Sequence, residues 1–207
     1  MRKFQTVLSI LLISLLAACA PRGEELLERA DSSLAKGDYR AAMIDLRNYV
    51  AKHPEDARAR ARLGLAMFEV GDLDGAAIEI TKARELGAER KDIVVPECRL
   101  LAVKGAYEQV LTDCGDTGDA GIDADLAATR GQALLGLKRD VEARASFESA
   151  LRANPDKLTA IQGLAAAVFA LEGAVPARKV FEAAPQSLKG QARYWLALGT
   201  SEVRAGD

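Results

Sequence analysis

The sequence contains one histidine, His53, which stands directly before Pro54. Histidine is the side chain that enzymes use most often as a general base, and no serine or cysteine of the chain has a matching base in its own segment. A single histidine beside a turn is typical of a protein surface. We therefore expect no catalytic residue and no enzymatic activity.

Five aspartates stand close together, at Asp113, Asp116, Asp119, Asp123 and Asp125. Such a cluster could suggest calcium binding, but an EF-hand loop needs alternating acidic positions and a terminal glutamate, and this spacing provides neither. We expect a solvated, flexible acidic loop and no metal site. No glycine-rich stretch follows a strand, so we also expect no nucleotide and no other cofactor.

The balance of charge argues against nucleic acid as a partner. The chain has 28 Lys and Arg residues against 30 Asp and Glu residues, and two of the cations, Arg2 and Lys3, lie in a segment that we expect to be removed. There is no run of five like charges and no alternation of basic with aromatic residues, which are the patterns that suit phosphates.

The first 18 residues have the layout of a secretory signal peptide. Two cations precede an apolar stretch from Phe4 to Ala18, which is shorter than the roughly 20 residues that span a bilayer comfortably. The stretch ends in Leu16-Ala17-Ala18-Cys19, which resembles a bacterial lipobox. The alternatives are an ordinary signal peptide with a chance cysteine and an uncleaved anchor.

The lipobox resemblance implies cleavage before Cys19, diacylglycerol on its thiol and acylation of the new terminus. Each buried methylene contributes about 0.8 kcal/mol, so two or three chains anchor a protein stably. Ala20, by analogy with enterobacterial lipoproteins, permits sorting to the outer membrane. We expect a signal peptide at 1–18, an acylated terminus with a short linker at 19–23, and a protein that faces the periplasm of a Gram-negative bacterium.

Cys98 and Cys114 are the other two cysteines, and after export they would meet an oxidising compartment. Cys98 precedes a turn near Gly105 and Cys114 follows it, so two antiparallel helices could bring the thiols together. A disulfide and two buried free thiols are both open at this stage. Thiol counting on unreduced protein would distinguish them.

The elements that must position these residues repeat along the chain. Gly37-Asp38, Gly71-Asp72 and Gly105-Ala106 recur at spacings of 34 and 34. Glycine at the end of a helix takes positive φ without a steric penalty, and the apolar residues around these turns follow helical spacing. With 49% hydrophobic but only 5% aromatic residues, the sequence predicts an all-helical protein made of hairpins.

This pattern resembles the tetratricopeptide repeat. The best matches are Gly131, Ala143, Phe147, Ala150 and Pro155 in the fourth unit, and Trp195, Leu198 and Gly199 in the sixth. The resemblance implies an all-α, right-handed superhelical array over residues 24–207, with about five and a half units. The units run roughly over 23–56, 57–90, 91–123, 124–157, 158–191 and from 192 onward.

Two units depart from the pattern. The third has a short second helix, Tyr107 to about Asp113, and in the fifth Pro185 arrives early after a turn at Glu172-Gly173. Residues 201–207 fall where the turn of the sixth unit is expected, and no polar cap follows, although the last element of an array needs one. We therefore expect the chain to be a fragment of a longer array, truncated at the C-terminus.

In tetratricopeptide arrays the first helix of each unit lines a concave groove, so the family geometry nominates eight groove residues. They are Arg58, Leu65, Phe68, Glu69, Arg99, Gln132, Gln162 and Phe169. Such a mixture of apolar and polar side chains fits a peptide or an extended segment of an envelope protein. The alternative is that several of them only pack between units.

Beyond the repeat, the chain resembles the tetratricopeptide lipoprotein that accompanies exosortase/PEP-CTERM systems and exopolysaccharide export. The likeness rests on the lipobox and on residues 38–54, 57–64 and 80–88, and it is best over residues 16 to about 112. It implies a membrane-tethered periplasmic scaffold for envelope proteins. The alternatives are a tetratricopeptide lipoprotein of pilus secretion or outer-membrane barrel assembly, and an accessory repeat domain of a longer enzyme.

Overall fold

The computed structural model describes residues 23–205, and within this range every regular element is a helix. The helices are α2 (Gly23–Ala35), α3 (Tyr39–Lys52), α4 (Ala57–Glu69), α5 (Leu73–Glu85), α6 (Arg90–Val103), α7 (Tyr107–Asp113), α8 (Ala120–Gly136), α9 (Asp140–Ala153), α10 (Leu158–Glu172), α11 (Ala174–Glu182), α12 (Gln186–Lys189) and α13 (Ala192–Ala205). The prediction of an all-α protein is confirmed. The expected signal peptide and Cys19 lie outside the described residues.

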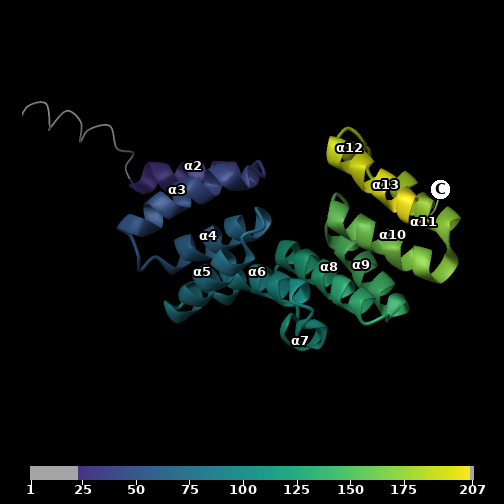
Figure 1. Ribbon diagram of the computed structural model, residues 1–207, viewed down its shortest axis with the longest axis horizontal. Coiled ribbons are helices and arrows are strands. Elements are labelled where there is room, and N and C mark those ends of the chain that lie inside the picture. Colours follow the sequence, from purple (N-terminus) through teal and green to yellow (C-terminus); the bar gives the residue numbers. More distant parts are fainter. Residues whose placement is uncertain (1–22, 206–207) are drawn as a thin grey trace, which may run out of the picture. The chain divides into compact units, whose positions relative to one another are not determined.

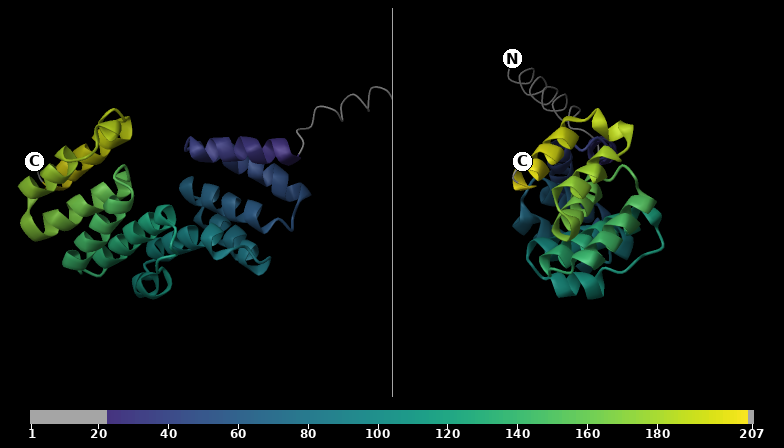
Figure 2. Two further views of the ribbon diagram at one scale, coloured as in Figure 1. Left: turned by 180° about the vertical axis from the view of Figure 1, so that it is seen from behind. Right: turned by 90° about the vertical axis from the view of Figure 1, so that its right-hand side faces the viewer.

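The described helices form two compact units that divide between Ala88 and Glu89, and we call them the N-terminal and C-terminal units. The N-terminal unit contains the hairpins α2–α3 and α4–α5. The C-terminal unit contains the hairpins α6–α7, α8–α9 and α10–α11, followed by α12 and α13 (Figures 1 and 2). In each hairpin we refer to a first helix and a second helix in chain order.

The turns of the N-terminal unit show why the glycine and aspartate recur. Gly71 ends α4 with a φ of 89°, and the next residue, Asp72, begins α5 by accepting a hydrogen bond from the backbone N–H of Gly75 at 3.0 Å. Gly37 and Asp38 do the same between α2 and α3. An aspartate in this position satisfies a helix N–H and contributes about 1 kcal/mol.

Small residues let the two helices of a hairpin approach closely. Gly64 on α4 faces α5, and a Cβ atom added there would lie 2.5 Å from Cγ1 of Ile80. Ile80 and its neighbour on the same helix, Ala76, are fully buried. The close spacing between the first and second helices therefore depends on the missing side chain at residue 64, because interiors this densely packed leave no room for another methyl group.

The fourth hairpin, α8–α9, lies at the centre of the C-terminal unit's core. Phe147 on α9 is fully buried, and its ring fills the space left by Gly131 on α8 and Gly163 on α10. A Cβ at residue 131 would lie 2.7 Å from the ring. One aromatic side chain thus joins three helices. The turn of this hairpin has Lys138 where the first three hairpins have glycine, and Lys138 has a φ of 61°.

The third hairpin has the short second helix that the sequence predicts. Helix α7 spans seven residues, against 14 in α9. Its side chains nevertheless reach the core, because Val110 is fully buried and the ring of Tyr107 packs against Gly136 of α8. The loop that follows ends at Asp119, which accepts hydrogen bonds from the N–H groups of Gly121 and Ile122 and starts α8 there. The expectation of one acidic loop is therefore wrong for Asp113, the last residue of α7, and for Asp123 and Asp125, which lie in α8.

The fifth hairpin is also distorted, as predicted. Gly173 makes the turn with a φ of 89°, and α11 ends after nine residues, before Pro185 begins the short α12. The expectation of a turn from residue 201 is wrong, since α13 continues to Ala205. The reason is that residues 201–205, Ser-Glu-Val-Arg-Ala, contain no glycine or proline to end a helix.

Candidate protein-binding surfaces

All eight residues that the sequence nominates for a groove lie on first helices, and they divide between the two units. Four lie on α4 of the N-terminal unit and four on α6, α8 and α10 of the C-terminal unit. Those of the N-terminal unit are Arg58, Leu65, Phe68 and Glu69, and those of the C-terminal unit are Arg99, Gln132, Gln162 and Phe169. Each set is therefore a separate surface.

The residues of the N-terminal unit are already engaged within the fold. Only Arg58 is exposed, whereas Leu65, Phe68 and Glu69 are half-buried. Arg58, Phe68 and Glu69 each take part in an intramolecular interaction. Leu65, Phe68 and Glu69 are thus less accessible than Arg58, and the role of all four in a groove stays a prediction.

The C-terminal unit presents a more accessible set on α8 and α10. Gln132 and Gln162 are exposed, and Phe169 retains 40% of its surface although it is an aromatic residue. Helix α10 has no charged residue from Leu158 to Leu171. Arg99 on α6 is half-buried and has an interaction within the chain. The accessible part of the nominated surface is therefore the face of α8 and α10 that carries the two glutamines and Phe169.

The nomination missed one apolar residue on the neighbouring helix. Leu196 on α13 is 70% exposed, and α13 packs on α10 through Ile161 and Tyr194. The signal was available in the repeat period, because Leu196 stands 34 residues after Gln162. We call Gln132, Gln162, Phe169 and Leu196 the first-helix surface.

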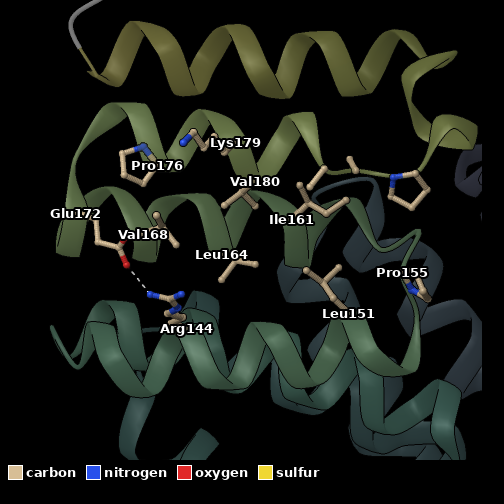
Figure 3. A pocket seen from close by; sticks show the side chains of 13 residues that line it. Arg144, Leu151, Pro155, Ile161, Leu164, Val168, Glu172, Pro176, Lys179 and Val180 are labelled. Carbon is tan, nitrogen blue, oxygen red and sulfur yellow. Dashed lines mark hydrogen bonds and ion pairs between the residues drawn. The ribbon is translucent and has the colours of Figure 1, made fainter.

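A cavity of about 640 Å³ lies on another face of α10, between α9 and α11 (Figure 3). No motif in the sequence predicts this cavity. Its walls are mostly apolar and come from three helices and the loops after α9 and α11; the lining residues are Arg144, Leu151, Pro155, Ile161, Leu164, Val168, Glu172, Pro176, Lys179, Val180, Ala183, Ala184 and Pro185. This volume lies within the range of about 300–1,000 Å³ that is common for ligand sites.

One end of this cavity is charged. The guanidinium of Arg144 donates to Glu172 at 2.6 Å and to Glu148 at 3.0 Å, and Figure 3 shows the first of these bonds across the cavity. Hydrogen bonds to Glu148 and Glu172 raise the pKa of Arg144 above its usual value. Lys179 lies at the same end. The cavity thus combines an apolar body with a polar end.

Cys98 and Cys114 are joined by a disulfide in the structure, with 5.9 Å between their Cα atoms, and both are buried. The bond connects α6 to the residue that follows α7. Two arginines hold the same segment, because Arg90 donates to the carbonyl of Asp113 at 2.7 Å and Arg130 to the carbonyl of Cys114 at 2.6 Å. This arrangement fixes the end of the short second helix.

The five aspartates do not converge on a common point. The carboxylate of Asp123 accepts hydrogen bonds from the backbone N–H and hydroxyl of Thr117 and from the N–H of Gly118, and these bonds lower the pKa of Asp123. Asp116 pairs with Arg130 and Asp125 with Lys157. Among residues 23–205, no group of three or more His, Cys, Asp or Glu side chains could hold a metal ion.

Two further features concern His53 and the lengths of the described helices. His53 is exposed, and its ring stacks on that of Tyr49 with 4.4 Å between centroids. None of the helices from α2 to α13 is long and apolar enough to cross a membrane.

The arrangement of hairpins is similar to that of several solved structures. A thermophilic tetratricopeptide-repeat protein from Thermus thermophilus superposes with a TM-score of 0.66 at 21% identity, over 86% of this chain and 99% of that one. The fold is that of a tetratricopeptide-repeat protein. PilF of Pseudomonas aeruginosa gives a TM-score of 0.59 at 21% identity, over 77% of this chain and 73% of its own. MamA from Desulfovibrio magneticus RS-1 gives 0.53 at 14% identity, over 84% and 98%.

No protein-family model and no curated protein matches the sequence. Because the three identities lie well below those of close relatives, the similarity defines how this chain folds and leaves its partner to be argued from its own surfaces.

Proposed function

We propose that this chain is a lipid-anchored periplasmic scaffold that binds other envelope proteins, in support of exopolysaccharide export or PEP-CTERM/exosortase-type protein sorting. The observation that carries the proposal is the first-helix surface. Its side chains are exposed, uncharged and partly apolar: Gln132, Gln162, Phe169 and Leu196. The cores of protein interfaces are enriched in aromatic residues and depleted of charged ones, which agrees with an uncharged surface that carries Phe169.

The chemistry of this surface suits a polypeptide. Gln162 and Phe169 lie seven residues apart on α10, and Ala166 between them is exposed and small. A partner backbone can therefore approach the helix between a hydrogen-bonding amide, which both donates and accepts, and an apolar ring. The absence of charge from residue 158 to 171 favours a partner segment that is also uncharged at this point.

The proposed location depends on the lipobox-like sequence at Cys19. Acylation there would hold the repeats at a membrane surface, with the array free to face the periplasm. The protein would then act by holding envelope proteins next to one another, since tethering a binding surface to a membrane raises its effective concentration for neighbouring envelope proteins.

The test places a photo-crosslinking amino acid at Gln162 in the full-length, acylated protein in membranes. We expect envelope proteins to be captured from this position. The matched control carries the same amino acid at Ser149, which is exposed on α9 outside the first-helix surface. Equal capture at both positions, or capture of cytoplasmic proteins alone, would contradict the proposal.

The pathway is tested separately. Exosortase and glycosyltransferase genes beside the reading frame would favour the PEP-CTERM assignment, whereas pilus or barrel-assembly genes would favour the other envelope pathways. Replacing Cys19 with Ser tests the anchor, because it should release soluble or uncleaved protein. Unchanged membrane fractionation would contradict acylation.

A further inference from the structure

The cavity between α9 and α11 is separate from the first-helix surface, although both use α10. It exists because the fifth hairpin is distorted. Helix α11 has nine residues and α9 has 14, so the second helix of the fifth hairpin stops early and leaves Ala183, Ala184 and Pro185 at the edge of the space.

The body of the cavity follows one face of α10. Ile161, Leu164 and Val168 are spaced by three and four residues and therefore lie on one side of the helix. From residue 161 to residue 168 the helix rises by about 10 Å. Side chains on the same side of an extended chain lie about 7 Å apart, so this length accommodates two of them. Leu151 and Val180 contribute apolar walls on either side (Figure 3).

The charged end of the cavity carries one cation that is paired with no carboxylate of the described residues. Arg144 is matched by Glu148 and Glu172. The side chain of Lys179 makes no hydrogen bond or ion pair with any other described residue. Lys179 lines the cavity and is exposed, so a carboxylate of a bound partner can pair with its ammonium group, and an exposed pair of this kind contributes up to about 1 kcal/mol.

We propose that this cavity binds an extended segment of a partner protein, through two aliphatic side chains over α10 and one acidic side chain that pairs with Lys179. The proposal rests on the proposed function only in that the partner is a protein, and it concerns a different surface. It would make the chain a scaffold with two binding surfaces on one unit, one uncharged and one selective for a carboxylate.

The experiment uses the full-length protein in phospholipid nanodiscs with isotope-labelled isoleucine, leucine and valine methyl groups. The probes are acetyl-Ala-Leu-Ala-Leu-Ala-Asp-amide, its Asn counterpart and an Asp peptide in which both leucines are alanine. Methyl resonances of Ile161, Leu164, Val168 and Val180 report on the cavity. Leu196 reports on the first-helix surface, and Ile44 on the N-terminal unit.

We expect the Asp peptide to shift the cavity resonances and to leave those of Leu196 and Ile44 in place. The Asn peptide should bind about two- to fivefold more weakly, as suits a partly exposed charge pair, and the peptide without leucines should not bind measurably. Lys179→Gln should remove the difference between the Asp and Asn peptides, whereas the matched variant Lys104→Gln should retain it. Ala183→Leu, which fills the edge of the cavity, should weaken both.

Three results would overturn the proposal. They are an absence of shifts at the cavity methyls, equal affinity for the Asp and Asn peptides, and shifts caused by dodecanoate but by none of the peptides, which would make the cavity a lipid site. A shift of Leu196 alone would support the proposed function while removing this second surface. Shifts at the cavity together with failed crosslinking from residue 162 would support this second surface and contradict the proposed function.

Discussion

In the third and fourth hairpins of the C-terminal unit, different chemistry holds the second helix in place. In the fourth hairpin, α9 has 14 residues and places Phe147 between Gly131 and Gly163. In the third, α7 has seven residues and is followed directly by Cys114, which is bonded to Cys98. A second helix long enough to bury an aromatic side chain is held by packing, whereas a helix half as long is held by a covalent bond.

Phe147→Ala should produce the largest effect. The ring is fully buried among three helices, and truncating such a residue typically costs about 3–5 kcal/mol because it leaves a cavity. We expect a loss of about that size in the free energy of unfolding of the C-terminal unit. Equilibrium urea unfolding followed by the fluorescence of Trp195, the only tryptophan in the chain, measures it.

Val141→Ala is the matched control for this prediction. Val141 lies on the same helix but is 68% exposed, so its truncation should change stability by less than about 0.5 kcal/mol. Equal effects of the two substitutions would show that the fourth hairpin is not held by Phe147.

The third hairpin should depend on its disulfide. The two cysteines are 16 residues apart, and closing a loop of about this length stabilises a protein by about 3 kcal/mol in the chain-entropy treatment. Cys98→Ser with Cys114→Ser should therefore lower the free energy of unfolding of the C-terminal unit by about 3 kcal/mol. Reduction of the original protein should have a similar effect.

Thiol counting on unfolded, unreduced protein provides the decisive check on this second prediction. We expect no free thiol from Cys98 and Cys114. Two free thiols, or a reduced protein as stable as the oxidised one, would mean that the short hairpin is held by Val110, Arg90 and Arg130 alone.

Much of this architecture was predictable because it depends on local sequence. Glycine turns at a spacing of 34 and the small residues between helices indicated the hairpins, and Tyr107 to Asp113 was predicted as the short helix that the structure contains. The extension of α13 to Ala205 was not predicted, although the period of 34 residues after Gly173 places the next turn at 207 and residues 201–205 favour a helix. The repeat and the local preference therefore agree here.

The surfaces were less predictable, because exposure depends on contacts between elements. Position in the repeat identified Gln162 and Phe169, but it could not distinguish them from Leu65 and Phe68, which are half-buried. The cavity beside Lys179 arises from the early end of α11 and the packing of three helices around it. No short motif encodes such a space.

The smallest predicted effect concerns the turns of the two hairpins. The third hairpin turns at Gly105, with a φ of 75°, whereas the fourth turns through Lys138, with a φ of 61°. A side chain in this left-handed region costs roughly 1–2 kcal/mol. Replacing it with glycine removes this cost, but part of the stabilisation is lost because glycine has greater conformational freedom in the unfolded chain. Lys138→Gly should therefore stabilise the C-terminal unit by about 0.5–1 kcal/mol, and Gly105→Lys should destabilise it by about the same amount. Urea unfolding of both variants, again by Trp195 fluorescence, measures the pair. If Lys138→Gly destabilised the unit, the lysine side chain would be making a contact that outweighs its backbone cost, and the two turns would not be equivalent positions of the repeat.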